Sequence, residues 1–595
     1  MKFSLKNNFK HFQFFYKYLG WRIVAALGLS LGVGVLDGLG LALFIPLIQL
    51  VVRKDGEALA EDSDAVSNFI LNTLEINPTL LNIFFLIFLF FSLKGIMKFF
   101  ESYTRTILMQ IFMRKIRFET LELLNNYSYD QFVKADAGKI QNTLSSEVNK
   151  LNMANRFYFK AIQFFVLILV YFALALGSDW KFTILVISGG LIVNQAFKFL
   201  YARTKYFSRQ LVAKSHIFHK LLMQKVSLYK YLKATGLLST YSSKLKNNIN
   251  EMEFVQRKLG MVDAALGSIR EPISILVIFG AIFFYVQLFD EVVGGILLSL
   301  LLLYRAITFF MAAQEQWNMF LGVSGSIENI QEFTQDLSRN KEVAGNLEFP
   351  GLKENIVFRN LSFTYEEKNL VLKHFQLAIK KNETLAIVGP SGSGKSTLIN
   401  LLTGILKPTS GEILIDGYNI SDFKPNSYRK KIGYIVQDPV IFSDSIFNNV
   451  TFWAEKSDYN LKRFYTAIEK AAILDFVDSL PGKENSILGN NGINVSGGQK
   501  QRLSIARELY KDVDLLLLDE ATSSLDSETE AEIHMKLDKL KGAYTMLIIA
   551  HRISTIKGAD RIIMLQNGKI EATGKYSELI DSSASFRRML SLQEL

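Results

Sequence analysis

Residues 384–397 read TLAIVGPSGSGKST, and this stretch decides the fold of the C-terminal part of the chain. Its first five residues form a short aliphatic run, typical of a parallel strand that is buried on both faces. A glycine-rich loop with the spacing G-x-x-x-x-G-K-S follows, and an apolar stretch then continues as a helix (398–402). Strand, loop and helix in this order predict a phosphate-binding loop in an α/β domain.

The residue types of this loop indicate how it holds a nucleotide. Glycines let backbone N–H groups wrap the phosphates, and the helix N-terminus favours negative charge. We expect Lys395 to meet the β- and γ-phosphate oxygens and Ser396 to reach Mg²⁺. The residues predicted to contact ATP in this loop are Gly389, Ser391, Gly392, Ser393, Gly394, Lys395, Ser396 and Thr397.

A second aliphatic run, 515–518, ends in a pair of carboxylates, Asp519 and Glu520. A strand that delivers acids to the edge of the sheet suits phosphoryl chemistry. We expect Asp519 to support the Mg²⁺ shell and Glu520 to polarise the attacking water. The alternative is that both acids only cap the next helix, and the phosphate loop argues against it.

The N-terminal half has the composition of a membrane protein. Hydrophobic residues make up 49% of the chain and charged residues 21%, and the apolar residues crowd into 21–311, which excludes a disordered chain and an ordinary soluble protein. A bilayer core needs about 20 apolar helical residues. Six such runs lie near 23–52, 80–100, 157–178, 181–200, 272–289 and 292–311.

Lys and Arg residues predict the orientation of these spans. Residues 1–22, 101–156 and 201–270 carry five, eight and thirteen of them, whereas the connections on the other side carry only Arg53 and Lys54. Basic loops face the cytoplasm. Both termini and both long loops are therefore expected there, in a protein of the cytoplasmic membrane. The loops have helical periodicity and few Gly or Pro, so spans 2 to 5 are expected to project beyond the lipid.

The predicted architecture follows from these patterns. Residues 1–340 form a membrane α-helical bundle of six transmembrane helices with long cytoplasmic extensions, fused to an α/β nucleotide-binding domain with a phosphate loop at 341–595. The chain has no cysteine, which excludes disulfides, thiolate zinc sites and a cysteine nucleophile. Its formal net charge is +11, and the basic loops beside the spans account for it, so no nucleic-acid partner is expected.

Residues Val495–Gln499 resemble the signature loop of ATP-binding cassette proteins. The order of the surrounding motifs also matches this family. Matching positions are Tyr365, where the family stacks adenine, Gln437 in its Q-loop, Ser523–Asp526 in its D-loop and His551 as its switch histidine. Six spans followed by one nucleotide-binding domain are similar to a half-transporter of the exporter group.

The resemblance implies the remaining site residues. It makes Glu520, His551 and Gln437 catalytic, and it adds Gln437 to Ser396 and Asp519 around Mg²⁺. The further residues implied to contact ATP are Tyr365, Ser496, Gly497, Gly498, Gln499 and Asp526. In this family ATP lies between the phosphate loop of one subunit and the signature loop of another. A single copy of each motif therefore implies a homodimer that uses ATP and Mg²⁺.

Two positions depart from the pattern of the family. Val495 stands where the signature usually has leucine, and Asn490 stands where exporters commonly carry a glutamate near the coupling region. The resemblance also implies that short helices at the tips of the extensions pass on the closure of the nucleotide domains. These tips are expected near 129–138 and 233–241.

Ionisable residues inside the predicted spans indicate the kind of substrate that is transported. A charged side chain in a bilayer costs free energy, so its presence there favours a functional role. Asp37, Lys94 and Arg305 are the candidate substrate residues, and Lys94 and Arg305 are expected to attract an anionic headgroup. Residues 37–50 and 428–452 also resemble flippases for lipid-linked oligosaccharides. The chain is thus expected to export or flip an amphipathic lipid or glycolipid among membrane lipids. A multidrug or peptide exporter and an ATP-gated channel are the alternatives.

Overall fold

The computed structural model describes residues 5–52, 73, 79–135, 137–289, 296–365, 370–489, 492, 494–519, 533, 535–536, 538–550 and 556–591. The chain divides into two compact units. The first comprises Met1–Tyr127 and Phe132–Lys341, and the second comprises Ser128–Gln131 and Glu342–Leu595.

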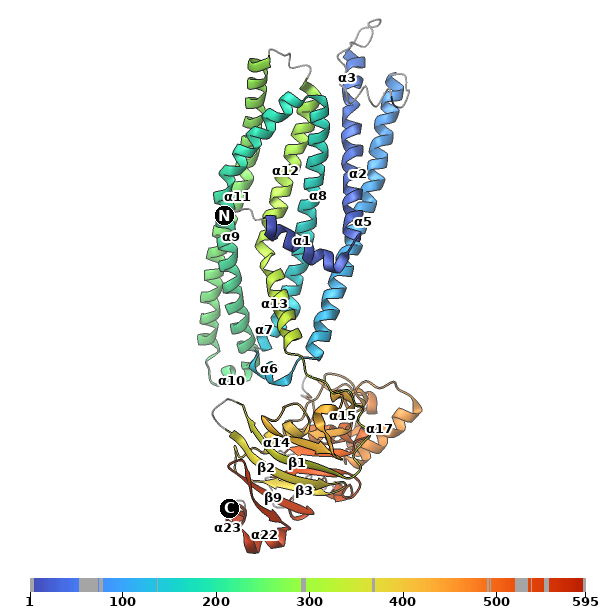
Figure 1. Ribbon diagram of the computed structural model, residues 1–595, viewed down its shortest axis with the longest axis vertical. Helices are drawn as coiled ribbons and strands as arrows, with labels where there is room; N and C mark the ends of the chain where they lie inside the picture. Colours follow the sequence, from blue (N-terminus) through green and yellow to red (C-terminus); the bar gives the residue numbers. More distant parts are fainter. Residues whose placement is uncertain are drawn as a thin grey trace. The chain divides into compact units, whose positions relative to one another are not determined.

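The first unit is helical (Figure 1). Its helices are α1 (Leu5–Leu19), α2 (Arg22–Ala42), α3 (Phe44–Val52), α5 (Leu80–Asn125), α7 (Ala137–Asn142), α8 (Val148–Ser178), α9 (Trp180–Ser227), α10 (Tyr229–Ala234), α11 (Leu238–Phe289), α12 (Leu297–Val323) and α13 (Gly325–Arg339). A π-helical turn (Thr143–Glu147) leads into α8, and the short helix α6 (Tyr129–Lys134) holds residues of both units.

Five segments within the described residues are helical, long and apolar enough to cross a membrane. They are Arg22–Ile48, Leu80–Asn125, Gly138–Ser178, Leu238–Phe289 and Leu297–Arg339. The remaining expected span, near 181–200, lies in α9. The structure does not describe the side chains of residues 191–198. The number of spans and the domain boundary at residue 340 stay predictions.

The first expected span, 23–52, consists of two helices. α2 ends at Ala42 and α3 begins at Phe44. Pro46 accounts for the break, because it has no N–H to donate and its ring collides with the carbonyl four residues earlier, that of Ala42.

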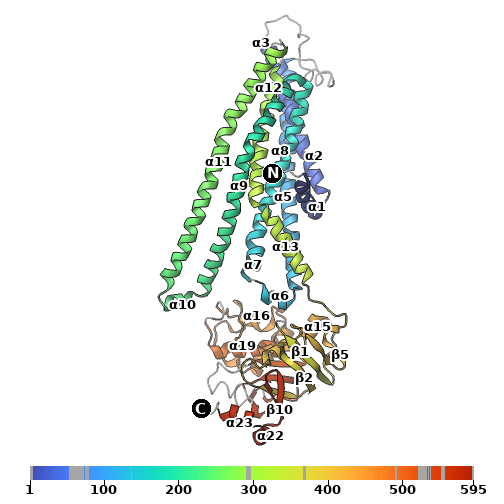
Figure 2. The same ribbon diagram turned by 60° about the vertical axis from the view of Figure 1, so that its left-hand side comes forward.

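Long helices run side by side in this unit. α8 packs along α12, and α9 packs along α11 (Figures 1 and 2). α9 and α11 have 48 and 52 residues, which at about 1.5 Å per residue is more than twice the roughly 30 Å of a bilayer core. The extensions expected from the sequence are therefore present as continuous helix.

Short helices lie at the ends of these extensions. α6 falls within the first expected tip, 129–138. α10 joins α9 to α11 (Figure 2) and ends at Ala234, so it lies mostly before the second expected tip, 233–241. The chain turns at Gly236, whose φ is +72°, and the last part of that expected tip already belongs to α11.

Two sheets form the framework of the second unit. The strands are β1 (Asn355–Thr364), β2 (Leu370–Lys380), β3 (Thr384–Val388), β4 (Ser410–Ile415), β5 (Tyr418–Asn419), β6 (Ile432–Ile435), β7 (Leu515–Asp519), β8 (Thr545–Ile549), β9 (Arg561–Gln566) and β10 (Lys569–Gly574). One sheet has the order β2-β1-β4-β5 and is antiparallel. The other has the order β10-β9-β3-β8-β7-β6 and is parallel from β9 to β6.

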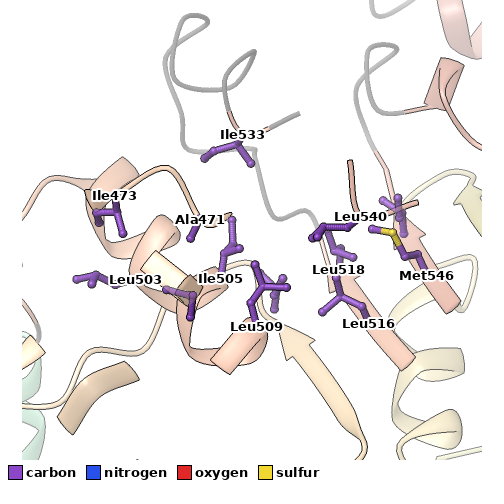
Figure 3. Close-up of a cluster of buried hydrophobic side chains, with 14 of the residues drawn as sticks. Ala471, Ile473, Leu503, Ile505, Leu509, Leu516, Leu518, Ile533, Leu540 and Met546 are labelled. Atoms are coloured by element: carbon purple, nitrogen blue, oxygen red, sulfur yellow. The ribbon is translucent and has the colours of Figure 1, made fainter. Parts of the chain in front are cut away.

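Helices cover these sheets and enclose the core. They are α14 (Lys395–Leu402), α15 (Pro425–Arg429), α16 (Ile446–Thr451), α17 (Asp458–Lys470), α18 (Leu474–Ser479), α19 (Gly497–Tyr510), α22 (Tyr576–Ser582) and α23 (Ala584–Ser591). All five residues of β3 are buried. Figure 3 shows one core, in which Leu503 and Leu509 of α19 lie in the same cluster as Leu516 of β7 and Met546 of β8. Aliphatic strands covered by apolar helix faces explain why the sequence pattern predicted this domain.

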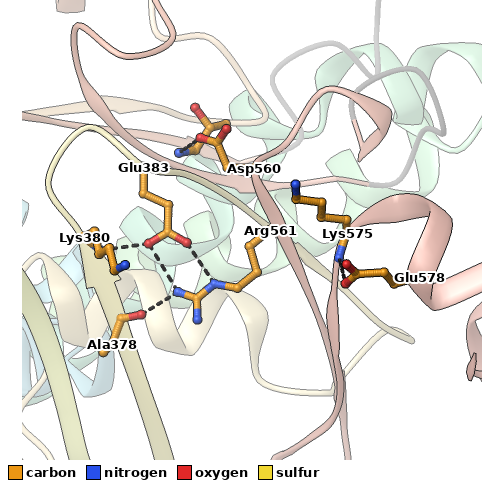
Figure 4. Close-up of polar contacts among 8 residues, drawn as sticks. Ala378, Lys380, Glu383, Asp560, Arg561, Lys575 and Glu578 are labelled. Carbon is orange, nitrogen blue, oxygen red and sulfur yellow. Dashed lines mark hydrogen bonds and ion pairs between the residues drawn. The ribbon is translucent and has the colours of Figure 1, made fainter.

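An arginine clamp ties the base of β3 to its neighbours (Figure 4). The Arg561 guanidinium donates to Glu383 Oε1 at 2.8 Å through Nε and to the Ala378 carbonyl at 2.5 Å through Nη2. Glu383 also accepts from the backbone N–H of Lys380 at 2.8 Å, and Asp560 accepts from that of Thr384 at 2.8 Å. The clamp fixes the strand that leads into the phosphate loop.

We expect Arg561→Ala to lower the stability of the second unit by about 1 to 3 kcal/mol, because it leaves the largely buried Glu383 carboxylate without its cation. The side chains of Arg561 and Glu383 are 32% and 12% exposed. The measurement is the apparent melting temperature of the whole purified protein. Arg359→Ala is the control, because its pair with Glu412 is 64% and 35% exposed and is worth at most about 1 kcal/mol. Equal shifts for the two variants would contradict the role of the clamp.

Candidate functional site

The parallel strands bring the predicted residues to one edge of the sheet. Ile549 of β8 lies beside Ile387 of β3 on one side and beside Asp519 of β7 on the other. Ile435 of β6 lies beside Leu518 of β7. The phosphate loop after β3, Asp519 and the exposed Gln437 after β6 therefore share the carboxyl edge, where ligands of α/β sheets bind.

Two glycines of the loop have no room for a side chain. Gly389 has φ of +149°, and a Cβ there would lie 2.1 Å from the Leu565 carbonyl oxygen. Gly394 has φ of +105°, and a Cβ there would lie 2.9 Å from the Leu372 side chain. The backbone conformation and the close packing both require glycine at these positions. The loop thus stays compact against β9 and β2 at the point where α14 begins.

The polar groups of the loop fit an anionic ligand. The Lys395 ammonium donates to the carbonyls of Gly389 at 2.8 Å and Pro390 at 3.0 Å. Ser393 is buried, and its hydroxyl has no hydrogen-bond partner among the described residues. A buried hydroxyl costs free energy unless it is paired, so this one suits a phosphate oxygen. Ser391, Gly392 and Ser396 are exposed around it.

Tyr365, the residue expected to stack adenine, contacts the start of α14. Its hydroxyl lies 3.2 Å from Thr397 Oγ1, and its ring packs edge-on against Phe363 at 4.8 Å between centroids. The Tyr365 side chain is 53% exposed. The structure thus brings the aromatic ring and the phosphate loop together and leaves much of the ring open to a base.

Asp519 stands at the end of β7, as the sequence predicted. The Tyr434 hydroxyl lies 3.5 Å from Asp519 Oδ2, and burial together with the Asp519 charge raises the pKa of Tyr434 to about 12. The described residues hold no group of three or more His, Cys, Asp and Glu side chains that could bind a metal by themselves. Mg²⁺ commonly uses one or two protein oxygens plus substrate phosphates, and Asp519 with the exposed Ser396 hydroxyl fits that donor set.

The signature loop begins α19, and its polar groups bond to each other. Gln499 N–H donates to Ser496 Oγ at 3.2 Å, and Ser496 N–H donates to Gln499 Oε1 at 2.9 Å, which makes a capping box. Ser496 and Gly497 are exposed, and Val495 packs into the core with 8% exposure. Ser496 therefore presents a helix N-terminus to the outside, and a valine fits the core where the family has leucine.

Several predicted residues lie outside the described part of the chain. They are Glu520, Asp526 and His551, together with Asn490. Their roles remain predictions.

Sequence reasoning missed one organising residue, Arg507 on α19. Its side chain donates to the carbonyls of Asn449 at 2.6 Å and Val440 at 2.8 Å, and to Asn449 Oδ1 at 3.1 Å. The guanidinium also lies over the rings of Phe442 and Phe452, 5.2 and 5.3 Å from their centroids. Burial lowers its pKa. An arginine on the apolar face of a helix was the one available signal, since no local pattern reveals partners 58 and 67 residues away.

The candidate substrate residues lie in the first unit. Lys94 on α5 forms an ion pair with Asp37 on α2, with 2.5 Å between Nζ and Oδ1. Arg305 on α12 is exposed. The sequence identified these three residues but not Tyr171, which donates a hydrogen bond to Asp37 from α8.

Two family models match the chain. The model described as "ABC transporter transmembrane region" matches residues 23–312, and the model described as "ABC transporter" matches residues 372–523. A solved structure of a bacterial Atm1-family ABC exporter with ATP bound is similar in fold. Its TM-score is 0.78 at 22% identity, and the match covers 97% of this chain and 99% of that one.

Curated proteins similar to this chain include exporters and flippases. The heterocyst differentiation ATP-binding protein HepA of Nostoc sp. is 29% identical over 79% of this chain and 76% of its own length. The ATP-dependent lipid A-core flippase of Ralstonia nicotianae is 42% identical over 40% of each chain. A multidrug resistance ABC transporter of Lactococcus lactis is 30% identical over 63% of this chain and 64% of its own length. The chain thus spans about two fifths of the flippase and nearly two thirds of the multidrug transporter.

Proposed function

Because the chain belongs to the ABC transporters, we propose that it uses ATP to export or flip an amphipathic, anionic lipid or lipid-linked glycan. Its two family matches cover the membrane region and the ATP-binding domain. The ATP-binding domain identifies the protein as an ATPase coupled to transport. The single observation that carries the proposal is the phosphate loop, with Lys395 and the unpaired Ser393 hydroxyl, in the same chain as apolar helices of bilayer length.

At the nucleotide site, each residue type has a distinct task. Lys395 and the N-terminus of α14 neutralise phosphate charge, and Tyr365 supports the base. Ser396, Asp519 and Gln437 hold Mg²⁺, which supplies further charge neutralisation when bound. Glu520 polarises the attacking water and accepts its proton, and His551 acts as the switch histidine.

The active assembly is a homodimer in the cytoplasmic membrane. Ser496 starts a helix whose exposed N-terminus suits the phosphates of a nucleotide bound to another copy. Each chain carries one phosphate loop and one signature loop, so two copies complete two equal sites. Both termini and the ATP-binding domain lie on the cytoplasmic side, as the distribution of Lys and Arg indicates.

A lipid-like cargo is supported by two observations. Several similar proteins are named lipid A-core flippases. The first unit also carries Asp37, Lys94 and Arg305 on helices of bilayer length, where charges are costly. The similarity to a multidrug transporter supports a second candidate, a multidrug exporter.

Cargo class is tested by ATPase stimulation of the homodimer in liposomes. We expect anionic lipids and lipid-linked glycans to raise ATP turnover severalfold, with smaller effects from peptides and uncharged lipids. Glu520→Gln removes the proposed base, so its ATP turnover gives the background of the measurement. Strong stimulation by hydrophobic dyes alone would favour the multidrug exporter, and turnover by a single subunit at full rate would overturn the dimer.

A further inference from the structure

Three helices of the first unit meet at one carboxylate. Lys94 of α5 lies 2.5 Å from Asp37 Oδ1, and the Tyr171 hydroxyl of α8 donates to Asp37 Oδ2. The Asp37 side chain is only 7% exposed, and Tyr171 is fully buried. Both oxygens of this acid thus have a partner on another helix.

Glycines bring α2 close enough to α8 for this contact. A Cβ at Gly34 would lie 2.8 Å from the Leu167 side chain, and a Cβ at Gly38 would lie 2.1 Å from that of Leu174. Gly34 and Gly38 are one turn apart, the spacing that lets two membrane helices approach closely. The acid at Asp37 is therefore held in place by the packing of the backbone and is not a flexible surface group.

A second cation lies beside this group. The Phe309 ring of α12 packs against the Tyr171 ring at 5.4 Å between centroids, and Arg305 lies one turn earlier on α12. Arg305 therefore lies on the stretch of α12 that contacts Tyr171. The Arg305 side chain is exposed, and no ion pair or hydrogen bond joins it to another described residue.

The charges of this group do not cancel. Asp37 offsets Lys94, which leaves the single positive charge of Arg305. An uncompensated charge inside a membrane is costly, so an exposed arginine on a helix of bilayer length favours a polar path or an anionic ligand over lipid tails. One negative charge on a ligand neutralises the group. A second negative charge on the ligand has no unpaired cation in this group to bind, because Lys94 is already paired with Asp37.

We propose that Asp37, Lys94 and Arg305 form a headgroup site for a single negative charge, in which Asp37 is the specificity-determining residue that disfavours headgroups with two. This site rests on the proposed lipid transport and narrows its substrate class to a phosphodiester or similar monoanion. Removal of the Asp37 charge makes the group doubly positive. Removal of the Lys94 charge as well restores the original balance.

The test compares two probes that share a polyprenyl tail and a sugar. One probe is linked through a phosphodiester, with one negative charge, and the other through a pyrophosphate, with two. The half-saturating concentration of each is measured in proteoliposomes by ATPase stimulation, and binding to the ATP-free homodimer is measured separately. We expect the wild type to favour the phosphodiester by about tenfold, which is less than a unit charge in direct contact provides, because water still solvates part of the second charge.

Three variants distinguish charge from packing. Asp37→Asn should reverse the preference, and Asp37→Asn combined with Lys94→Gln should restore it. Arg305→Gln should weaken both probes by about tenfold without reversing the preference, because the group is then neutral and still offers no cation to a second negative charge. Failure of the double variant to restore the preference, or an unchanged preference in Asp37→Asn, overturns the inference.

Glu101→Gln is the matched control. Glu101 on α5 is 3% exposed, pairs with Lys98 at 2.8 Å and accepts from Ser30 of α2 at 2.5 Å. It is an equally buried acid about two turns from Lys94, outside the proposed site, so its loss should leave the preference unchanged. The same reversal in Glu101→Gln would overturn the inference. If the wild type binds neither probe, both the site and the proposed lipid transport fail, whereas equal response to both probes overturns the site alone.

Discussion

Lys395→Ala should lower ATP turnover by about a thousandfold and abolish its stimulation by the proposed lipid cargo. Lys395 is the only cationic residue in the sequence of the phosphate loop, 389–397. Its ammonium donates hydrogen bonds to the carbonyls of Gly389 and Pro390 at the start of the loop. Losing one preorganised donor to developing phosphoryl charge typically costs about 10²- to 10³-fold in rate, and a full charge is at the upper end. ATP turnover and nucleotide binding are measured on the same reconstituted sample.

Two further variants make this result specific. Lys395→Arg keeps the charge but replaces a compact ammonium by a planar fork, so we expect it to remain nearly inactive. Lys407→Ala removes an exposed lysine just after α14 and should keep wild-type turnover. Residual turnover above about one tenth in Lys395→Ala would contradict a direct role for this lysine.

Arg507→Met should destabilise the second unit by about 3 to 5 kcal/mol. The substitution keeps much of the side-chain volume but removes a buried guanidinium from two carbonyls and from Asn449 Oδ1. Buried acceptors without a donor each cost about 1 to 3 kcal/mol, and the two ring contacts are lost as well. For a domain of this size we expect an apparent melting temperature lower by roughly 6 to 15 °C.

Lys431→Ala is the control in the same unit. Lys431 pairs with Asp512 at 2.6 Å, and the Asp512 side chain is 86% exposed, so its carboxylate stays solvated when the lysine is removed. We expect a loss of at most about 1 kcal/mol. Equal apparent melting temperatures for Arg507→Met and the control would mean that the buried arginine contributes no more to the free energy of unfolding than a surface charge does.

Local patterns predicted much of the ATP-binding domain. β3, the phosphate loop and α14 follow each other in the chain, and β7 delivers Asp519 where the aliphatic run ends. Such elements are set by neighbours in sequence, so periodicity and glycine spacing were enough. The strand order that brings Gln437 and Asp519 to the same edge of the sheet needed the structure, since it depends on pairing between distant segments.

The membrane part was less predictable for the same reason. Apolar runs located its long helices. The break at Leu43 depends on Pro46, which lies inside the stretch expected to form a single span. The sequence shows that Asp37 and Lys94 are charges within expected spans. Their pairing across 57 positions, and the hydrogen bond from Tyr171, arise from tertiary packing that no local pattern encodes.

The close approach of α2 and α8 has an evolutionary consequence. Leu167 and Leu174 of α8 pack directly against the backbone of α2 at Gly34 and Gly38, which have no side chain. The shape of this region is therefore set by backbone and aliphatic groups. Asp37, Lys94 and Arg305 take no part in these contacts. In the proposed headgroup site, substitution of a single charged residue can therefore change the charge of the preferred cargo. The packing of α2 against α8 is kept when this happens.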